Sequence, residues 1–382
     1  MTEQTPMVDK EQTPITESEE LPSKATIFVK LGKVYFMSFI QGVIVIFRLM
    51  WLCIRLGRAA VFDTKVYPRP TELLDDPSLG EHKFIQLDAE SETKPGLRLH
   101  YVVSGQEGKP LMLFLHGFPE FWFSWRHQIR EFQKDYRVVA LDQRGYGESD
   151  KPEGVENYLW HQLMDDVKQV VEGLGYSSCV LVAHDYGGGV AWAFGRKFPH
   201  LVDKLIVMNS PPRAAMLKAF EQIKEQKDMA WFVFLFQLRG LAEVYFRSCD
   251  FNFIDRCFGI DKPGANDMLS SSVSASQAEV DAYKHVFSQP GGLTPAINWY
   301  RTRFLLVNRL VYDMDYTMPV LLVWGDMDVC LHRNIPDYVQ EMNSGITVRR
   351  ISDAGHFVQM DKPDVVNRLM REWLGEVESS TS

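Results

Sequence analysis

The 382-residue sequence has few cysteines, and none stands in a pattern typical of a cross-linked or metal-bound domain. Its five cysteines are an odd number and include no C-x-x-C pair, so neither a disulfide framework nor a zinc site is indicated. No run of Lys or Arg exceeds two residues and the formal net charge is -9, which excludes an extended basic surface for nucleic acid. No phosphate loop and no metal-ligating cluster is evident, so we expect no cofactor and no metal.

Large apolar residues are nearly absent from the first 26 positions, where Thr, Glu, Gln, Ser and Pro dominate. Such a segment cannot offset the entropy of ordering, so we expect a disordered tail over residues 1–33. From Val34 to Ile54 the chain instead has 21 residues whose only charge is Arg48. As a helix this stretch would be about 32 Å long, close to one hydrocarbon thickness. The sequence therefore predicts a transmembrane or monotopic anchor helix over 34–56, in which Arg48 snorkels to the interface.

Two other interpretations of the apolar stretch stay open, a buried amphipathic helix and a secretory signal. The following "RLGRAAVFD" is too basic for a good cleavage site, which disfavours the signal. Three basic residues on each side leave the orientation undecided, namely Lys24, Lys30 and Lys33 against Arg55, Arg58 and Lys65. We expect a single-pass membrane protein of the endoplasmic reticulum whose folded domain faces the cytosol, which fits the absence of a glycosylation sequon.

Eight short apolar runs, each followed by turn residues, predict the strands of a sheet. From the third run onward the apolarity is nearly continuous, as in parallel strands covered by helices on both faces. The strand candidates are 84–88, 97–103, 111–117, 136–142, 178–185, 204–209, 319–326 and 346–352. We expect a mainly parallel α/β core over 81–212 and 316–376, a helical cap over 213–315, a linker over 57–80 and a tail over 377–382.

The stretch "VAHDYGGGVAW", residues 182–192, has the shape of a nucleophile elbow, a strained turn between a strand and a helix. Small residues must flank a nucleophile in such a turn, and Ala183, Gly187 and Gly188 supply them around Asp185. An aspartate that only caps a helix is the alternative, but it does not account for the preceding apolar run or for the partners that follow. We therefore expect Asp185 to be a nucleophile.

Candidate partners of Asp185 follow later in the chain, in the order acid and then histidine that such a triad requires. "WGDMDVC" ends one predicted strand and offers Asp326 and Asp328, and "DAGHFVQMDKP" ends the last strand and offers His356. Because the carboxyl ends of parallel strands gather at one edge of a sheet, these side chains are expected near Asp185. Histidine suits the role of base, since it accepts and returns a proton near neutral pH.

The loop "HGFPEFWFSW" follows the third predicted strand, where an oxyanion hole is expected. The backbone N–H groups of Phe118 and Tyr186 are its expected donors, while Pro119 cannot donate and can be preceded by a cis bond. A carboxylate nucleophile suits displacement at saturated carbon, which gives an alkyl ester of the enzyme. Water activated by His356 would then hydrolyse the ester. The practical leaving groups are a halide or the strained oxygen of an epoxide.

Five motifs together resemble one family, the α/β-hydrolase-fold epoxide hydrolases. They are "HGFPEFWFSW", "DQRGYGESDKP", "VAHDYGGGVAW", "FSQPGGLTPAINWYR" and "AGHFVQMDKP", within a similarity that runs from about Phe84 to Trp373. The leading apolar helix is similar to that of the membrane-bound animal branch. The resemblance implies an α/β-hydrolase fold, with a mainly parallel eight-stranded sheet, an inserted helical cap and a preceding anchor helix.

The same resemblance assigns roles to residues of this sequence. It implies Asp185 as nucleophile, His356 as base and Asp328, rather than Asp326, as the acid that orients the base. Tyr300, in "NWYR" of the cap, matches a tyrosine that hydrogen-bonds the epoxide oxygen and protonates it as the ring opens. This tyrosine is the feature that best separates epoxide hydrolysis from dehalogenation.

The sequence departs from the family pattern at one position of the cap. A second tyrosine normally stands at the start of a segment ending in "F-Q", but here "MAWFVFLFQ" places Phe232 there, beside Trp231. Tyr245 or Tyr283 would have to replace it, although no spacing requires either. Loss of one of two donors to a developing alkoxide lowers the rate by about 10- to 10³-fold. Trp231, Phe232 and Trp122 are expected to line the substrate pocket.

These features predict an epoxide hydrolase that converts apolar or lipid-derived epoxides and water to vicinal diols, attached to a membrane by its N-terminal helix. A haloalkane dehalogenase-like hydrolase is one alternative, but it commonly needs an indole N–H where Tyr186 stands. A weakly catalytic, membrane-bound lipid-binding homologue is the other, motivated by the missing tyrosine at Phe232.

Overall fold

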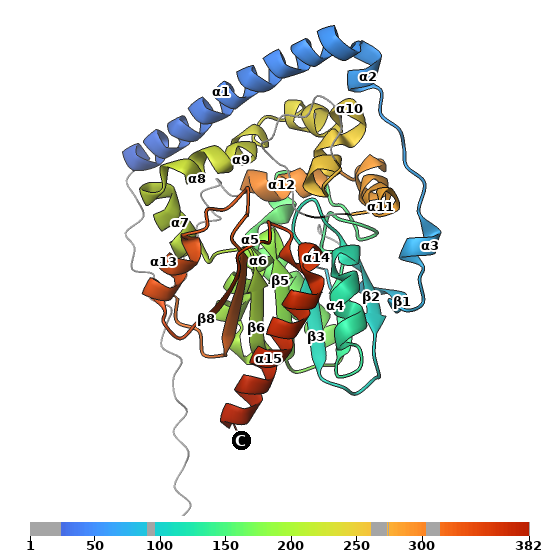
Figure 1. Ribbon diagram of the computed structural model, residues 1–382, viewed down its shortest axis with the longest axis vertical. Helices are drawn as coiled ribbons and strands as arrows, with labels where there is room; N and C mark the ends of the chain where they lie inside the picture. Colours follow the sequence, from blue (N-terminus) through green and yellow to red (C-terminus); the bar gives the residue numbers. More distant parts are fainter. Residues whose placement is uncertain (1–23, 90–95, 261–272, 274, 303–313, 382) are drawn as a thin grey trace, which may run out of the picture.

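Eight strands form one sheet at the centre of the molecule (Figure 1). The computed structural model describes residues 24–89, 96–260, 273, 275–302 and 314–381. The strand order is β1-β2-β4-β3-β5-β6-β7-β8, in which the β1–β2 and β2–β4 pairs are antiparallel and the others parallel. The strands are β1 Glu81–Gln86, β2 Arg98–Ser104, β3 Leu111–Leu115, β4 Arg137–Leu141, β5 Cys179–His184, β6 Val202–Met208, β7 Val320–Gly325 and β8 Thr347–Ile351. The predicted mainly parallel sheet of eight strands is confirmed.

Helices cover the sheet on both faces, which explains the near-continuous apolarity of its central strands. Every residue of β3, β5 and β7 is buried. Helices α4 and α15 contact each other in front of the sheet in Figure 1, and α5 and α6 contact each other behind it. The helices of the core are α4 Arg126–Phe132, α5 Trp160–Gly173, α6 Asp185–Lys197, α13 Ile335–Met342, α14 Val358–Asp361 and α15 Pro363–Thr381, with 3-10 turns η1 Trp122–Trp125, η2 Val155–Tyr158 and η3 Pro199–Leu201.

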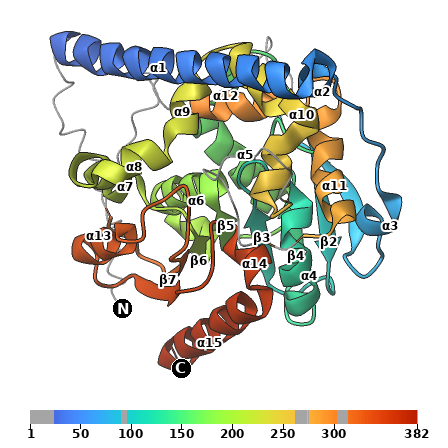
Figure 2. The same cartoon turned by 45° about the horizontal axis from the view of Figure 1, so that its top comes forward.

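The cap is inserted between β6 and β7 and lies over the carboxyl ends of the parallel strands (Figure 2). Its described helices are α7 Arg213–Gln222, α8 Lys224–Met229, α9 Trp231–Leu235, α10 Leu241–Cys257, α11 Gln277–Ser288 and α12 Thr294–Thr302. Helix α10 is broken from Ser248 to Phe251, where three successive residues have positive φ angles. Two parts of the expected cap, 261–272 and 303–313, lie outside the described residues.

The N-terminal helix α1, Lys24–Leu56, starts before the expected boundary at Val34. The expected tail over 1–33 is therefore wrong for residues 24–33, which contain no proline and continue the helix; residues 1–23 lie outside the described residues. The linker that follows carries two short helices, α2 Arg58–Phe62 and α3 Thr71–Leu74. The expected tail over 377–382 is also wrong up to Thr381, because α15 continues and Val377 packs against the core.

Candidate active site

Asp185 lies at the tip of a sharp turn between β5 and α6. Its φ is +47°, a backbone conformation that residues other than glycine rarely adopt. A Cβ added to Gly187 would lie 2.3 Å from the carbonyl oxygen of His116. A Cβ added to Gly117 would lie 2.4 Å from the Cβ of Asp185. Glycine is therefore required both at Gly187, within the turn, and at Gly117, in the facing loop after β3, for the Asp185 carboxylate to lie at the carboxyl edge of the sheet.

Backbone N–H groups hold the carboxylate of Asp185 in a fixed orientation. The N–H of Phe118, in the loop after β3, donates to Oδ1 of Asp185 at 3.0 Å, and the N–H of Tyr186 also donates to this carboxylate. The bond between Phe118 and Pro119 is cis. Burial raises the pKa of Asp185. The hydrogen bond and charge of His356, together with the Tyr186 N–H, lower this pKa by a larger amount, so it lies below the ordinary value.

His356 lies between two carboxylates. Its Nε2 is 3.5 Å from Oδ2 of Asp185, and its Nδ1 is 2.7 Å from Oδ2 of Asp328. Burial lowers the pKa of His356, but the negative charges of Asp328 and Asp185 outweigh it and raise this pKa well above the ordinary value. Asp326 points elsewhere, since its Oδ1 accepts a hydrogen bond from Nε of Arg350 at 2.9 Å. Of the two candidate acids, only Asp328 contacts His356.

Four hydrogen bonds fix the carboxylate of Asp328. Its Oδ1 accepts the backbone N–H groups of Cys330 and Leu331 at 2.7 and 2.9 Å. Its Oδ2 accepts the side-chain amide of Asn209 at 2.7 Å besides the bond from His356. Asn209 follows β6 and has a φ of +39°. Our reading of the sequence did not single out Asn209, because a lone asparagine after a strand carries no motif of its own.

A buried pair, Glu120 and His184, lies directly behind these groups and was also missed. Oε2 of Glu120 accepts the N–H of Gly117 at 2.7 Å and lies 2.6 Å from Nδ1 of His184, and Oε1 accepts the amide of Gln359 at 2.7 Å. Nε2 of His184 lies 2.9 Å from the backbone oxygen of His356. Burial raises the pKa of Glu120, but the neighbouring His184 lowers it by more. The pair thus ties the loops that carry Phe118, Asp185 and His356 to one another.

Two adjoining cavities meet at Asp185. Asp185, Phe232, Tyr300 and Cys330 line both of them. Phe232 and Tyr300 come from α9 and α12 of the cap, and their rings lie 5.8 Å apart in an edge-to-face arrangement. Burial, followed by the charge of Asp185, raises the pKa of Tyr300 well above its ordinary value. The cap therefore places one phenol, and beside it one phenyl ring, over the carboxylate.

Comparison with known proteins points to one family. The family described as "alpha/beta hydrolase fold" matches residues 110–363. Epoxide hydrolase 4 of Mus musculus is 38% identical over 332 residues, which cover 86% of this chain and 89% of that protein, and epoxide hydrolase 3 of Xenopus tropicalis is 38% identical over 78% of each. A mutant epoxide hydrolase from Bacillus megaterium, 35% identical, has a crystal structure that matches with a TM-score of 0.66 over 77% of this chain and 100% of its own.

The chain belongs to the epoxide hydrolases of the α/β-hydrolase fold. The predicted family and fold are confirmed. The relatives align over most of the chain, so the membership covers both the sheet core and the cap rather than one motif.

Two tryptophans of this epoxide hydrolase do not line the cavities at Asp185, contrary to expectation. Trp122 is buried beside the sheet, where its backbone N–H donates to Oδ1 of Asp142 at 2.9 Å and its ring packs against His82. Trp231 precedes Phe232 in α9, and its indole faces Tyr245 of α10, with ring centroids 5.8 Å apart. Because successive helical residues point about 100° apart, only Phe232 of this pair faces the cavity.

Neither tyrosine considered as a replacement for the second cap tyrosine lines these cavities. The hydroxyl of Tyr245 accepts a hydrogen bond from the guanidinium of Arg48 in α1 at 3.2 Å. The hydroxyl of Tyr283 lies 3.0 Å from that of Ser124. Among the three tyrosines weighed from the sequence, only Tyr300 reaches the cavity that Asp185 lines.

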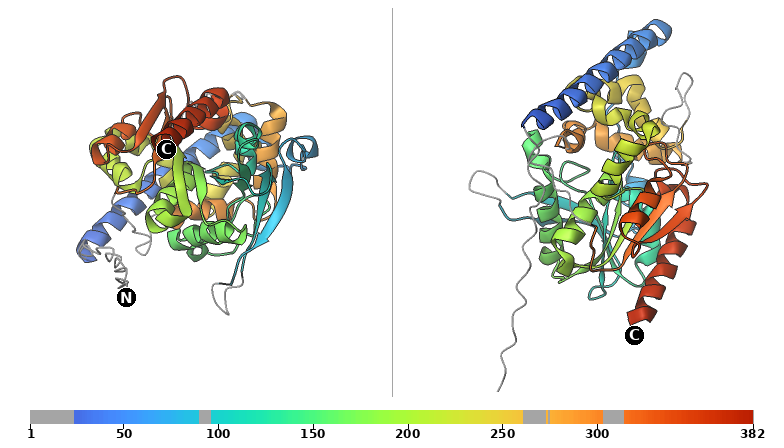
Figure 3. Two further views of the ribbon diagram at one scale, coloured as in Figure 1. Left: turned by 90° about the horizontal axis from the view of Figure 1, so that it is seen from below. Right: turned by 90° about the vertical axis from the view of Figure 1, so that its left-hand side faces the viewer.

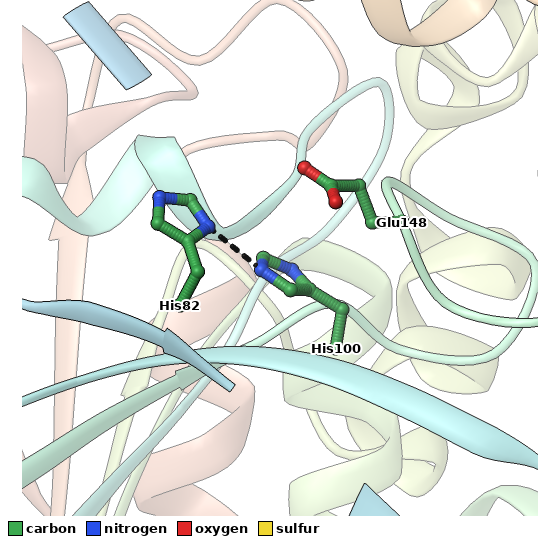
Figure 4. A group of neighbouring side chains, drawn as sticks. All are labelled: His82, His100 and Glu148. Carbon is green, nitrogen blue, oxygen red and sulfur yellow. Dashed lines mark hydrogen bonds between the residues drawn. The ribbon is translucent and has the colours of Figure 1, made fainter. Parts of the chain in front are cut away.

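A second group of histidines, away from the cavities, joins β1 to β2 (Figure 4). Nδ1 of His82 lies 2.8 Å from Nε2 of His100, Nε2 of His82 lies 2.7 Å from the carbonyl oxygen of Leu74, and Nδ1 of His100 lies 2.8 Å from Asp142. Burial raises the pKa of Asp142, but His100 lowers it to about 2. This chain of hydrogen bonds accounts for both histidines as structural groups, with Glu148 at its exposed edge.

Proposed function

We propose that this epoxide hydrolase converts apolar epoxides to vicinal diols through an alkyl ester on Asp185. The proposal rests on one observation, which is that the two oxygens of the Asp185 carboxylate have different neighbours. Oδ1 of Asp185 accepts the N–H of Phe118, Oδ2 faces His356, and Tyr300 lines the same cavity. Nucleophile, oxyanion donors, base and proton donor would thus meet at one substrate.

In the first step Oδ2 of Asp185 attacks a carbon of the epoxide. As the new bond forms, the carbon–oxygen bond of the ring breaks and its oxygen takes the hydroxyl proton of Tyr300. The low pKa of Asp185 keeps the nucleophile ionised, and the high pKa of Tyr300 keeps the donor protonated until the alkoxide, a stronger base than the phenolate, develops. Tyr300 then regains a proton from solvent.

In the second step water attacks Cγ of the ester while Nε2 of His356 takes a proton from it. The negative charge that develops on Oδ1 faces the N–H groups of Phe118 and Tyr186. When the tetrahedral intermediate collapses, Oδ2 leaves in the diol with the proton from His356, the oxygen of water stays in Asp185, and the resulting carboxylic acid releases its proton to solvent, which balances the proton taken up by Tyr300. Formation of the ester removes one of the negative charges that raise the pKa of His356, so this pKa falls and more of His356 is in the neutral form that can accept a proton from water.

The two-step route can be tested with two variants. Asp185→Ala should abolish turnover, because no ester can form. His356→Gln should form the ester but not hydrolyse it, so intact-protein mass spectrometry should detect an adduct with the mass of the epoxide. Asp326→Asn is the control, since Asp326 pairs with Arg350 and not with His356, and it should turn over normally. A reactive epoxide that wild-type protein hydrolyses without any adduct in His356→Gln would contradict the route.

The lining of the cavities supports an apolar substrate. Most side chains around Asp185 are aromatic or aliphatic, including Phe118, Phe253 and Phe357. The epoxide hydrolase from Bacillus megaterium has been crystallised with its product, a naphthyloxy-propane-1,2-diol. We therefore propose lipid-derived or aryl epoxides as substrates. A screen of fatty-acid and aryl epoxides with Asp185→Ala as the blank would identify the class, and turnover of small polar epoxides alone would contradict it.

Phe232 favours a second candidate, a weakly catalytic lipid-binding homologue, because it offers no hydroxyl to the epoxide oxygen. A wild-type protein that forms no ester with any epoxide of the screen would support this candidate. Dehalogenation is less well supported, since the hydroxyl of Tyr186 donates to the backbone oxygen of Trp299 and no indole stands in its place. Halide release from a chloroalkane, without epoxide turnover, would reverse that order.

We also propose that α1 attaches the protein to the endoplasmic reticulum membrane with the catalytic domain in the cytosol. The apolar part of the helix, Leu31–Leu56, is long enough to cross a bilayer, although a signal sequence near an N-terminus passes the same test. Resistance to alkaline extraction and an intact N-terminus in the mature protein would support an anchor. A mature protein that begins after residue 56 would identify a signal instead.

A further inference from the structure

Helix α1 lies along the outside of the cap over most of its length (Figure 3). It contacts α9, α10 and α2. Ser38, Val45, Leu49 and Leu52 are at most 9% exposed and follow one another at helical intervals, so they form one face. We call this the cap-facing side of α1. It is the side by which α1 is attached to the folded domain.

Two contacts show that this side is shaped for the cap. A Cβ added to Gly42 would lie 2.7 Å from Cδ1 of Leu238 in the cap, so the backbone of α1 lies directly against the end of this side chain, which would have to move for a larger residue. Arg48 donates to the hydroxyl of Tyr245 at 3.2 Å, and its guanidinium lies 5.8 Å from the centre of that ring. Arg48 was expected to snorkel towards headgroups, but it is bound to the cap instead.

The opposite side of α1 is apolar and exposed. Tyr35, Phe36, Phe39, Phe47 and Ile54 are each at least 63% exposed. This outer side extends along the helix from Tyr35 to Ile54, in contrast to the single exposed apolar residues that are normal on a soluble surface. Helices that lie in a membrane interface likewise carry aromatic and aliphatic side chains on the side that faces the lipid.

A helix attached along one side cannot cross a bilayer unless the cap enters the hydrocarbon or the contacts of Gly42 and Arg48 are broken. The cap exposes Arg239, which follows Leu238 in the chain, and Arg247, two residues after Tyr245, and these charges make entry into hydrocarbon unfavourable. Resting on the membrane attachment proposed above, we propose that α1 lies in the plane of an anionic membrane surface, with its outer side in the lipid and the cap against the headgroups.

The charges of this region fit such a surface. Residues 31–66 contain five basic residues and one acidic residue, a net charge of +4, in a chain whose net charge is -9. Lys33 lies near one end of the apolar stretch, Arg55 and Arg58 near the other, and all three are exposed. Cations at both ends are expected when both ends lie at one surface, whereas a spanning helix concentrates them on its cytoplasmic side.

The in-plane arrangement brings the substrate cavity close to the lipid. Helix α9, which packs against α1, also supplies Phe232 and Val233 to the cavity at Asp185. An epoxide dissolved in the bilayer would thus meet the cap that carries Tyr300. The arrangement is a property of α1 and the cap together and does not depend on the chemistry at Asp185.

Topology in sealed microsomes tests the proposal. Full-length protein carries one epitope before Met1 and another after Ser382, and both are followed during protease digestion with and without detergent. The in-plane helix predicts that both epitopes are digested together in intact vesicles. Protection of one epitope, in protein that resists salt extraction, would overturn the in-plane arrangement but not membrane attachment. Full release of the protein by salt would overturn both.

Flotation with vesicles of defined composition tests the surface itself. Wild-type protein should bind phosphatidylcholine vesicles that contain phosphatidylserine more tightly than pure phosphatidylcholine vesicles. Arg55→Gln/Arg58→Gln should weaken binding to the anionic vesicles by about fivefold for each cation removed. The control Lys134→Gln/Lys197→Gln removes two exposed cations away from α1 and should bind like wild type. Equal losses in both variants would contradict an anionic surface at α1.

Discussion

Asp185 combines a positive φ with a carboxylate whose two oxygens have different neighbours. The backbone conformation places the side chain at the edge of the sheet. The N–H of Phe118 donates to one carboxylate oxygen, and the other oxygen faces His356. A serine hydroxyl at this position would offer a single oxygen, which attacks and cannot also enter the oxyanion hole. In the proposed mechanism, a carboxylate keeps Oδ1 in the hole throughout both steps. Aspartate therefore suits this position, because its own carboxylate becomes the carbonyl group of the ester.

The pKa shifts at the site predict different pH profiles for the two steps. Ionised Asp185 is present above its lowered pKa and is lost only as the pH falls through that value, and Tyr300 stays protonated well above neutral pH. Ester formation should therefore be nearly constant between about pH 5 and pH 9. Ester hydrolysis requires neutral His356 and should rise with pH.

Single-turnover experiments separate these steps, with rapid quenching for ester formation and the decay of the adduct for hydrolysis. An Asp328→Asn variant provides the comparison, because loss of that negative charge should move the hydrolysis profile to lower pH and leave ester formation flat. Ester formation that already falls by half near neutral pH would show that Asp185 is not held ionised.

Phe232 and Tyr300 predict a pair of opposite mutational effects. Tyr300→Phe removes the phenol that the cap places at the cavity and should slow ester formation by about 10²-fold, with a much smaller effect on ester hydrolysis. Phe232→Tyr adds a phenol beside it and should raise the rate of epoxide turnover, by about tenfold if its hydroxyl reaches the ring oxygen.

Rates of adduct formation and decay measure both effects, and circular dichroism confirms that the variants fold. Trp231→Phe is a matched control for the cap helix, since this side chain does not line the cavities at Asp185. A Tyr300→Phe variant that slows only the second step would remove Tyr300 from the role of proton donor.

At the scale of elements, the elbow between β5 and α6 predicts which glycines of α6 can be replaced. Gly187→Ala places a Cβ 2.3 Å from a backbone oxygen and should destabilise the protein by about 1–3 kcal/mol. Gly195→Ala, in the same helix, meets its nearest atom at 3.5 Å and should be neutral or stabilising by up to about 1 kcal/mol. Urea unfolding measures both changes, and equal stabilities would mean that the turn relaxes freely.

The elements that could be predicted from the sequence are those with local signals. The strands were predictable because buried parallel strands are continuously apolar, and the elbow because its glycines adjoin a strand. Asn209 and Glu120 were not, because a buried polar residue becomes recognisable only when its partners from distant loops are known. The position of Trp231 was misjudged for a related reason, since neighbouring aromatics in a short helix point in different directions and the sequence does not say which one faces the cavity.

At the scale of the whole molecule, the protein divides into a catalytic unit and α1. The crystal structure from Bacillus megaterium is covered completely by 77% of this chain, so a catalytic unit of this family is complete at that size. All the residues to which we assign chemical steps, from Phe118 to His356, come from the sheet core and the cap. The part that α1 adds is a second apolar surface, which covers the cap on one side and is exposed on the other. Its loss should therefore change where the enzyme works more than what it does.

Removal of residues 1–57 tests this division. The truncated protein should keep its kcat/KM for a water-soluble epoxide within about a factor of two, because changes away from a site alter free energies by about 0.5 kcal/mol or less. It should lose stability on the order of a few kcal/mol, since the apolar area buried by Val45, Leu49 and Leu52 is lost together with the contacts of α1 with Leu238 and Tyr245. Calorimetry and steady-state kinetics on the same preparation measure both quantities. A folded truncated protein without activity would show that α1 is part of the catalytic unit, and unchanged stability would show that its contacts with the cap do not stabilise the fold.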